Sequence, residues 1–123
     1  MGKTVLIVDD SNTMRKIVSR ALRQAGIEFD EILEAGDGQE ALNVLAASQV
    51  DVVLSDINMP NMTGLEFLKA KAEDEAIKDI PVVMISTETG ADIIDQAKAL
   101  GAKGAVKKPF TPDLINDTLG PLL

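Results

Sequence analysis

The sequence predicts an α/β fold in which five short strands alternate with five helices. Three observations favour this class. Short apolar runs rich in β-branched residues recur along the chain, as expected of strands buried on both faces. Stretches with apolar residues at helical spacing separate these runs, and Gly, Pro, Asn and Asp stand at most boundaries. Such alternation predicts a parallel sheet with right-handed crossovers and helices on both faces.

The first two strand–helix pairs illustrate both signals. Thr4–Val8 is almost wholly apolar and predicts a buried strand. From Met14 onward the apolar residues fall on one helical face, and Gly26 is placed to end that helix. Glu31–Ala35 predicts a weaker strand, and a Gly-Asp-Gly turn separates it from a short helix at Gln39–Ala47.

The remaining elements repeat the pattern. A third strand is expected at Val50–Ser55, where Val52, Val53 and Leu54 are consecutive, and a helix is expected at Thr63–Ala72. The later strands and helices are expected at Pro81–Ile85, Ala91–Leu100, Gly104–Lys107 and Pro112–Leu119, with Gly120 and Pro121 stopping the last helix.

Composition limits the function classes. The chain has 123 residues, enough for one core, so a single domain over 1–123 without an output domain is expected, as a monomer. Its net charge of −8 disfavours nucleic acid and anionic lipid as partners. Cys and His are absent, which excludes disulfides, thiol nucleophiles and His-based acid–base chemistry. Neither a membrane-spanning run nor a signal peptide is recognisable, so a cytoplasmic location is expected.

Polar side chains follow the predicted strands. Asp9 and Asp10 come after the first strand, Asp56 after the third, Ser86 after the fourth and Lys108 after the fifth. In the flavodoxin-like strand order 2-1-3-4-5, the carboxyl ends of strands one and three are neighbours, so the three carboxylates should converge in one crevice. Two carboxylates about 4 Å apart repel by roughly 4 kcal/mol at an effective dielectric of about 20, so the cluster calls for a cation. Oxygen ligands without His or Cys favour Mg²⁺ together with a phosphate oxygen.

Four segments carry a family resemblance that covers essentially the whole chain. They are Val5–Asp10, Ser55–Gly64, the apolar strand that ends in Ser86, and Lys107–Phe110. With these segments, the sequence resembles the receiver domains of two-component response regulators, and its layout is similar to the single-domain chemotaxis regulators.

The resemblance implies a phosphorylation site. It makes Asp56 the acceptor of a phosphoryl group from the phosphohistidine of a histidine kinase. It also implies that Asp10 and Asp56 bind Mg²⁺ directly, that the backbone carbonyl of Asn58 is a third ligand, and that Asp9 acts mainly through water. The physical chemistry agrees, because a carboxylate forms an acyl phosphate when a metal screens the incoming charge.

The resemblance also implies roles for the residues at the rim of the crevice and names the expected partner proteins. Ser86 stands where the family's Ser or Thr contacts the phosphoryl group, and Lys108 stands where its Lys pairs with that group. The implied pathway is chemotaxis, with a CheA-type kinase as donor, the flagellar motor switch as target and a phosphatase as a further partner. The switching face would be formed by the fourth helix, fifth strand and fifth helix.

Several alternatives compete with this interpretation. Asp10 and Ser11 could serve only as the charge and cap of the following helix. A haloacid-dehalogenase-type phosphatase also uses an Asp nucleophile, but it needs a second Asp where Asn58 stands. A flavodoxin-like cofactor carrier would need aromatic residues and no acidic pair beside its phosphate. A degenerate receiver would not need Asp56 or Lys108, and a stand-alone receiver of another phosphorelay stays open beside chemotaxis.

One position departs from the family pattern. Ala105 stands where many receivers carry a Tyr or Phe that turns inward on phosphorylation. A methyl group cannot make that movement. We therefore expect switching to depend on the loop at Thr87 and Glu88 and on the start of the following helix.

Overall fold

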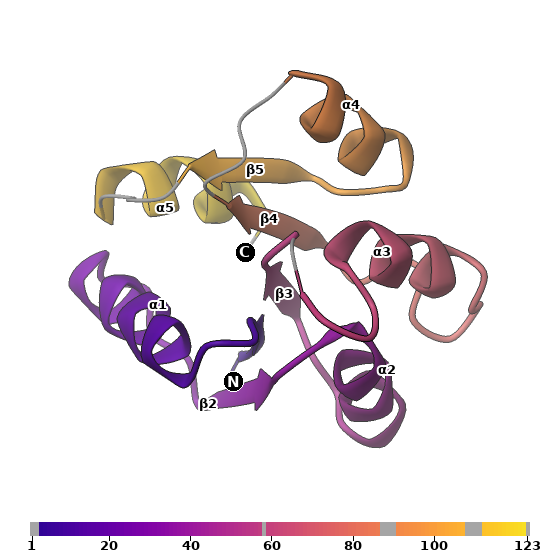
Figure 1. Ribbon diagram of the computed structural model, residues 1–123. Coiled ribbons are helices and arrows are strands. Elements are labelled where there is room, and N and C mark those ends of the chain that lie inside the picture. The colour runs from indigo at the N-terminus through magenta and orange to yellow at the C-terminus, as the bar shows by residue number, and fades with distance from the viewer. Residues whose placement is uncertain (1–2, 58, 87–90, 108–111, 123) are drawn as a thin grey trace.

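Five parallel strands form one sheet in the order β2-β1-β3-β4-β5, which confirms the predicted topology (Figure 1). The structure is a computed structural model and describes residues 3–57, 59–86, 91–107 and 112–122. The strands are β1 (Thr4–Val8), β2 (Glu31–Ala35), β3 (Val52–Ser55), β4 (Val82–Ser86) and β5 (Gly104–Lys107). The helices are α1 (Asn12–Gln24), α2 (Gly38–Ala47), α3 (Gly64–Ala72), α4 (Ala91–Ala99) and α5 (Pro112–Leu119), followed by the 3₁₀ turn η1 (Gly120–Leu122).

Most element boundaries match the sequence prediction to within two residues. β3 begins at Val52 rather than Val50. Asp51, just before it, already contacts β1: its amide donates to the Thr4 carbonyl at 2.9 Å, and its carboxylate accepts from the Thr4 amide at 2.7 Å. The predicted end of the last α-helix at Leu119 is confirmed, and the chain continues from Gly120 as the 3₁₀ turn η1. Gly26 ends the first helical region as predicted and has a φ of 79°, a conformation that favours glycine.

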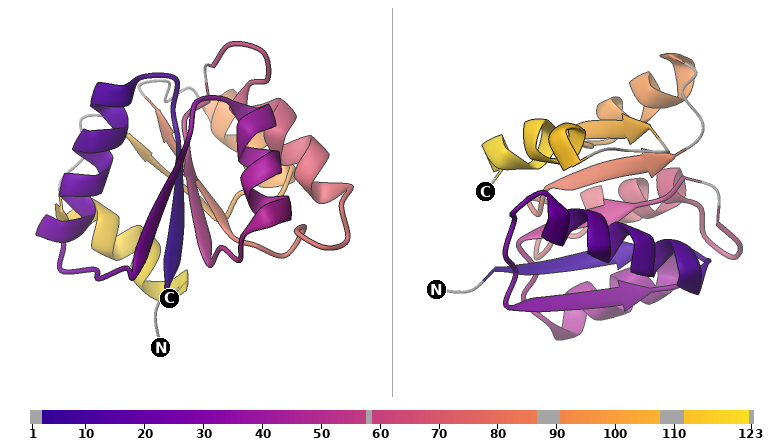
Figure 2. Two further views of the ribbon diagram at one scale, coloured as in Figure 1. Left: turned by 90° about the horizontal axis from the view of Figure 1, so that it is seen from below. Right: turned by 90° about the vertical axis from the view of Figure 1, so that its left-hand side faces the viewer.

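The helices cover the two faces of the sheet in two layers, which Figure 2 shows edge-on. α1 and α5 lie on one face, where Val18, Leu22 and Ile115 pack against Val5 and Ile7 of β1. α2, α3 and α4 lie on the other face, whose core includes the alternate β1 residues. A strand with both faces buried must be apolar throughout, which explains the continuous run at the start of the sequence.

The register of the sheet places the carboxyl ends of β1 and β3 side by side. Val8 is the partner of Ser55 across the two strands, and the Asp56 amide donates to the Val8 carbonyl at 2.9 Å. On the other side of β1, the Asp9 amide donates to the Ala35 carbonyl of β2 at 3.1 Å. Asp9 and Asp56 therefore leave the sheet as neighbours. Within the described ranges, no helix has the length and apolar character needed to cross a membrane.

Candidate phosphorylation and metal site

Asp9, Asp10 and Asp56 come together at the carboxyl ends of β1 and β3. One carboxylate oxygen from each lies within 4.8 Å of the other two. Asp9 is buried, Asp10 is exposed and Asp56 is half-buried, so the cluster opens from the core to the solvent. The predicted convergence of the three carboxylates is confirmed.

The β1–α1 turn fixes Asp9. Its Oδ1 accepts a hydrogen bond from the Ser11 amide at 3.0 Å. Ser11 in turn is the N-cap of α1, and its Oγ accepts from the Met14 amide at 3.2 Å. The capping role considered from sequence is therefore real for Ser11, while Asp10 belongs to the acidic cluster. Arg15 of α1 donates to the Asp9 carbonyl and pairs with Glu34 of β2 at 2.9 Å.

The β3–α3 loop fixes Asp56. Its Oδ1 accepts from the Ile57 amide at 2.7 Å, and its backbone carbonyl accepts from the Ser55 hydroxyl at 2.9 Å. Ser55 is fully buried, so this bond satisfies a hydroxyl that has no access to water. The side chain and the backbone of Asp56 are both held before any ligand binds.

Gly64 permits the loop to fold closely onto itself. Its amide donates to the Ile57 carbonyl at 2.8 Å. A Cβ at this position would lie 2.3 Å from the Asp56 carbonyl oxygen and 2.9 Å from the Ile57 Cα. Both of these atoms are backbone, which cannot swing aside as a side chain can. The path of the chain next to Asp56 therefore requires glycine.

A clasp between two loops holds the far end of the same loop. We use this term for the contacts of Asp37 and Gly38 with Asn61 and Met62. Nδ2 of Asn61 donates to Oδ2 of Asp37 at 2.9 Å, and the Gly38 amide donates to the Met62 carbonyl at 3.2 Å. The Met62 side chain lies so close that a Cβ on Gly38 would be 2.6 Å from its Cγ. Asn61 has a φ of 62°, in the left-handed region.

The clasp lowers the pKa of Asp37. The hydrogen bond from Asn61 is the largest cause, and the bond from the Glu40 amide to Oδ1 of Asp37 at 2.9 Å adds to it. Both bonds favour the charged form of the carboxyl group. Asp37 is the N-cap of α2, so this carboxylate both begins the helix and anchors the loop.

The other predicted site residues are only partly described. Ser86 is the last residue of β4. It lies at the carboxyl ends of the strands, as Asp56 does after β3. The side chain of Ser86, together with Asn58, Thr87, Glu88 and Lys108, lies outside the described part of the chain. Ala105 of β5 is half-buried and packs against the core on the α2–α4 face.

The acidic cluster fits a divalent cation. Two oxygens on opposite sides of an ion bound at about 2.0–2.5 Å lie roughly 4–5 Å apart, which matches the span of the three carboxylate oxygens. The donors are all hard oxygens, and the sequence contains neither His nor Cys to favour a softer metal. The three carboxylates therefore offer a donor set that suits a hard divalent cation.

Comparison with known proteins identifies the family. The model of the response regulator receiver domain matches residues 5–119. The chain belongs to the response regulator receiver domain family. This receiver domain is 41% identical over 115 residues to the chemotaxis protein CheY of Pseudomonas aeruginosa, covering 94% of this chain and 91% of that protein. It is 40% identical over 121 residues to a CheY homologue of Campylobacter jejuni, covering 97% and 91%.

Comparison with solved structures agrees with this family membership. Vibrio cholerae chemotaxis protein CheY4 superposes with a TM-score of 0.87 at 41% identity, and all of both chains is covered. CheY of Borrelia burgdorferi, solved as a CheX-CheY-BeF₃-Mg²⁺ complex, gives a TM-score of 0.83 at 27% identity, covering 98% of this chain and 90% of that one. The receiver domain is thus CheY-like, a signalling protein rather than a true enzyme, which decides against a phosphatase of the haloacid-dehalogenase type.

The contacts of the clasp are not among the features predicted from the sequence. Gly36, Asp37 and Gly38 predict only a turn there, although the spacing of Asp37 and Glu40 is compatible with an N-cap. Thr63 and Glu66 form a capping box at the start of α3 that the motif Thr-x-x-Glu could have revealed. No sequence signal pairs Asp37 with Asn61, because that contact depends on how α2 packs against the β3–α3 loop.

Proposed function

We propose that Asp56 is the phosphoacceptor of a chemotaxis response regulator. The observation that carries the proposal is the convergence of three carboxylate oxygens within 4.8 Å at the carboxyl ends of β1 and β3. Mutual repulsion makes such a cluster costly unless it serves a cation. Membership of the CheY-like receiver domains gives this cluster its expected use.

In the proposed reaction, an oxygen of the Asp56 carboxylate attacks phosphorus of a phosphohistidine. The P–N bond breaks, its electron pair returns to the imidazole nitrogen, and an acyl phosphate forms on Asp56. The hydrogen bond from the Ile57 amide to Oδ1 of Asp56 orients the carboxylate for in-line attack. A histidine kinase of the CheA type is the proposed donor.

Mg²⁺ is the metal that we propose for the oxygen site. Asp10 and Asp56 would bind it directly, Asp9 would act through water, and the carbonyl of Asn58 would complete the protein ligands. When bound, the ion neutralises charge on the transferring phosphoryl group. The Ser86 hydroxyl and the Lys108 ammonium are proposed to contact the same group, as in the family.

The output is proposed to be a change in affinity for a protein target. The face of α4, β5 and α5 would bind the flagellar motor switch, and a phosphatase would reset the signal. That such receivers form protein complexes is supported by the Borrelia relative, which was solved together with CheX. We propose that the chain acts in the cytoplasm as a single receiver domain. A stand-alone receiver in a different phosphorelay is the second candidate.

A small phosphodonor tests the acceptor. Acetyl phosphate with Mg²⁺ should add one phosphoryl group, measured as intact mass, and EDTA should prevent the addition. Asp56→Asn should abolish it. Asp30→Asn is a matched control, because Asp30 lies next to β2 at the amino ends of the strands. If Asp56→Asn gains phosphate as fast as the unchanged protein does, the assignment is wrong.

A complementation experiment tests the pathway. In a motile bacterium that lacks its own CheY, the unchanged chain should restore spreading through soft agar, and Asp56→Asn should not. If the protein is phosphorylated in vitro by acetyl phosphate but restores no spreading, the phosphorelay candidate is favoured over chemotaxis.

A further inference from the structure

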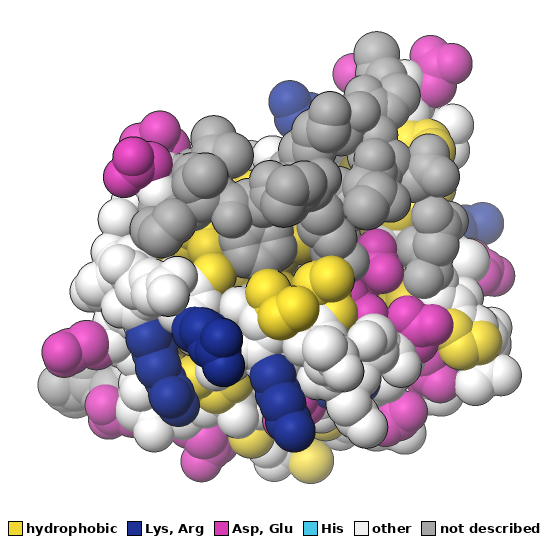
Figure 3. Space-filling model, turned by 60° about the vertical axis from the view of Figure 1, so that its left-hand side comes forward, with side chains coloured by type: hydrophobic (Ala, Val, Ile, Leu, Met, Phe, Trp, Pro, Cys, Tyr) yellow, Lys and Arg dark blue, Asp and Glu magenta, His cyan; other side chains and the backbone are white. Residues whose placement is uncertain are grey.

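A hollow of about 430 Å³ lies between α1 and the edge strand β2. It is lined by basic side chains of α1, namely Arg15, Lys16, Arg20 and Arg23. α1 contains these four cations and no acidic residue, although the whole chain has a net charge of −8. Figure 3 shows Lys and Arg side chains gathered on this side of the molecule around exposed hydrophobic atoms.

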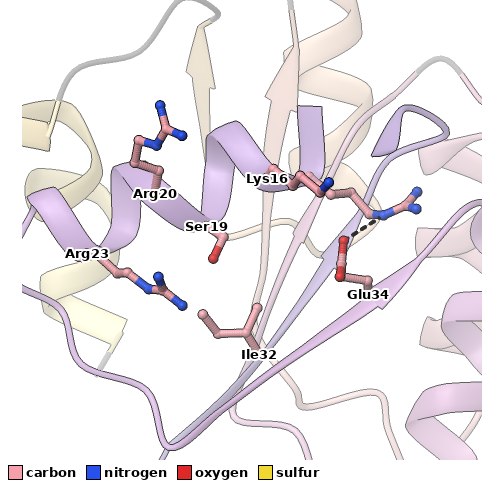
Figure 4. Close-up of a pocket in the computed structure, with 7 residues that line it drawn as sticks. Lys16, Ser19, Arg20, Arg23, Ile32 and Glu34 are labelled. Carbon is pink, nitrogen blue, oxygen red and sulfur yellow. Dashed lines mark hydrogen bonds and ion pairs between the residues drawn. The ribbon is translucent and has the colours of Figure 1, made fainter. Parts of the chain in front are cut away.

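Three of the four cations are available to a partner. Arg15 is paired with Glu34, whereas Lys16, Arg20 and Arg23 are exposed and pair with no carboxylate among the described residues. In Figure 4, Arg23 points into the space beside β2 and Arg20 points to another side of the helix, so the charges spread over the surface of α1. Like charges placed this close repel one another, so their grouping does not stabilise the fold by itself.

The floor of the hollow is less polar than its rim. Ile32 of β2 is half-buried and faces Ser19 of α1 across the space (Figure 4). A second hollow, of about 400 Å³, shares Arg23 and Ile32 with the first. It continues toward the α1–β2 loop, where its lining includes Phe29. Together the two hollows, which we call the α1–β2 groove, offer basic groups along one part and apolar surface along the other.

We propose that the α1–β2 groove binds an acidic segment of a partner protein that carries an apolar residue next to its carboxylates. Carboxylates of the segment would contact Lys16, Arg20 and Arg23, and the apolar residue would enter the hollow beside Phe29. Arginine suits this task, because its planar guanidinium forms paired hydrogen bonds with a carboxylate.

Charge and shape favour a peptide segment over other anions. The cations are spread along α1. Arg20 and Arg23 point in different directions in Figure 4, so they do not converge on a single point as they would around one phosphate ion. Nucleic acid and anionic membranes are disfavoured by the net charge of −8 and by acidic groups at both ends of the groove, Glu28 and Asp30 at one and Asp10 at the other. These acidic groups also limit the segment's carboxylates to the basic middle of the groove, whereas its apolar residue lies beside Phe29.

The proposal goes beyond the proposed function, because binding in the groove needs neither Mg²⁺ nor a phosphoryl group on Asp56. The α1 side of the receiver would then be a binding surface that does not depend on phosphorylation, separate from the α4–β5–α5 face proposed for the output. A partner held there would stay bound through cycles of phosphorylation.

Titration with synthetic peptides tests the proposal. The probes are a hexaglutamate capped at both ends and the same peptide with one added leucine. Backbone NMR in EDTA should show saturable shifts at residues 15–24 and 31–34 with either peptide, and shifts at residues 26–30 only with the leucine peptide. Higher salt should weaken binding, since exposed charges are screened over about 8 Å at physiological ionic strength.

Two variants of equal charge make the test specific. Lys16→Gln/Arg20→Gln/Arg23→Gln should weaken binding of the leucine peptide by roughly tenfold or more. Lys69→Gln/Lys78→Gln/Lys98→Gln removes three exposed lysines from α3, the segment after it and α4, and should bind as the unchanged protein does. Circular dichroism confirms that each variant is folded.

Three outcomes would overturn the proposal. Equal weakening in both variants would mean that only net charge matters. Shifts outside residues 15–34 would place the peptide on another surface. Inorganic phosphate or ATP shifting the same amides, while neither peptide does, would make the groove a small-anion site.

Discussion

Asn61 donates a hydrogen bond to Asp37 at 2.9 Å, across 24 residues of sequence. The bond joins the N-terminus of α2 to the loop that begins at Asp56, which lies beside β1 in the sheet. The loop after Asp56 is therefore held in part by a residue, Asn61, that touches none of the three carboxylates of the acidic cluster in any described contact.

At Asn61 the contribution of the side-chain hydrogen bond can be separated from that of the positive φ. Asn61→Gly keeps the positive φ but removes the amide, and it should lower the free energy of unfolding by about 1–2 kcal/mol. Asn61→Ala should cost about 1 kcal/mol more, because alanine is strained at a φ of 62°. Urea unfolding measures both, and Mg²⁺ titration by calorimetry should show weaker binding in each. Unchanged stability in Asn61→Gly would contradict the role of the amide.

Asp37 should give the clasp a pH dependence in acid. Its pKa in the folded protein is lowered from 3.8, chiefly by Asn61, so the charged form is favoured by folding. The resulting stability is fully present above the unfolded pKa and is lost as the pH falls through the folded pKa. The difference in unfolding free energy between the unchanged protein and Asp37→Asn should therefore shrink between about pH 5 and pH 2. A difference that is constant over this range would refute the prediction.

Gly64 should tolerate no side chain. In Gly64→Ala the new Cβ would meet the Asp56 carbonyl oxygen at 2.3 Å, and the loop would have to move. We expect a loss of about 1–3 kcal/mol in unfolding free energy together with slower phosphorylation by acetyl phosphate. Gly120→Ala is the matched control, because no atom lies within 4 Å of its built Cβ, and it should change neither quantity. Wild-type phosphorylation in a folded Gly64→Ala protein would show that the close approach is unimportant.

Lys71 should make the folded protein more stable as the pH rises above neutral. This lysine of α3 is 5% exposed, and its ammonium donates to the Lys78 carbonyl at 2.9 Å. Burial lowers its pKa below 10.5, Lys103 adds to the effect and Asp79 opposes it. Folding therefore disfavours the charged form of Lys71. Burying the charged ammonium lowers the free energy of unfolding at neutral pH, and this loss disappears as the pH rises from the pKa of Lys71 in the folded protein to its pKa in the unfolded chain.

Lys71→Met provides the comparison for this effect, since methionine keeps most of the buried chain without the charge. Melting temperatures measured from neutral pH to about pH 10 should rise for the unchanged protein relative to the variant. Parallel curves for the two proteins would show that burial of the ammonium has no energetic consequence.

Ala105 leads to a prediction about switching. It is half-buried in β5 beside Met84 of β4, so a larger side chain there must either enter the core or cover the surface. Beryllofluoride with Mg²⁺ should shift NMR signals at residues 86–93 more than those of β5. Ala105→Tyr should increase the β5 shifts. Strong β5 shifts in the unchanged protein, with none at 86–93, would reject this route.

The strands could be predicted from the sequence because they depend on local patterns, and the acidic cluster followed once the flavodoxin-like strand order was assumed. Apolar runs mark the strands, and parallel strands bring the residues after Val8 and Ser55 to one edge. The buried Lys71 could not be predicted, because lysine normally belongs to a solvated helix face and its acceptor is a backbone carbonyl seven residues away. The clasp and the α1–β2 groove likewise depend on how helices and loops pack, which no short motif records.

The position of Asp9 and Asp56 directly after β1 and β3 has a consequence for hydrogen exchange. Every residue of β3 and all of β1 except Thr4 is buried, so the amides of these strands should exchange only when the whole molecule unfolds. Edge strand β2, with Glu31 and Glu34 exposed, should open more readily. A receiver whose edge strand has opened locally would still hold its three carboxylates together, because Asp9 and Asp10 follow β1 and Asp56 follows β3.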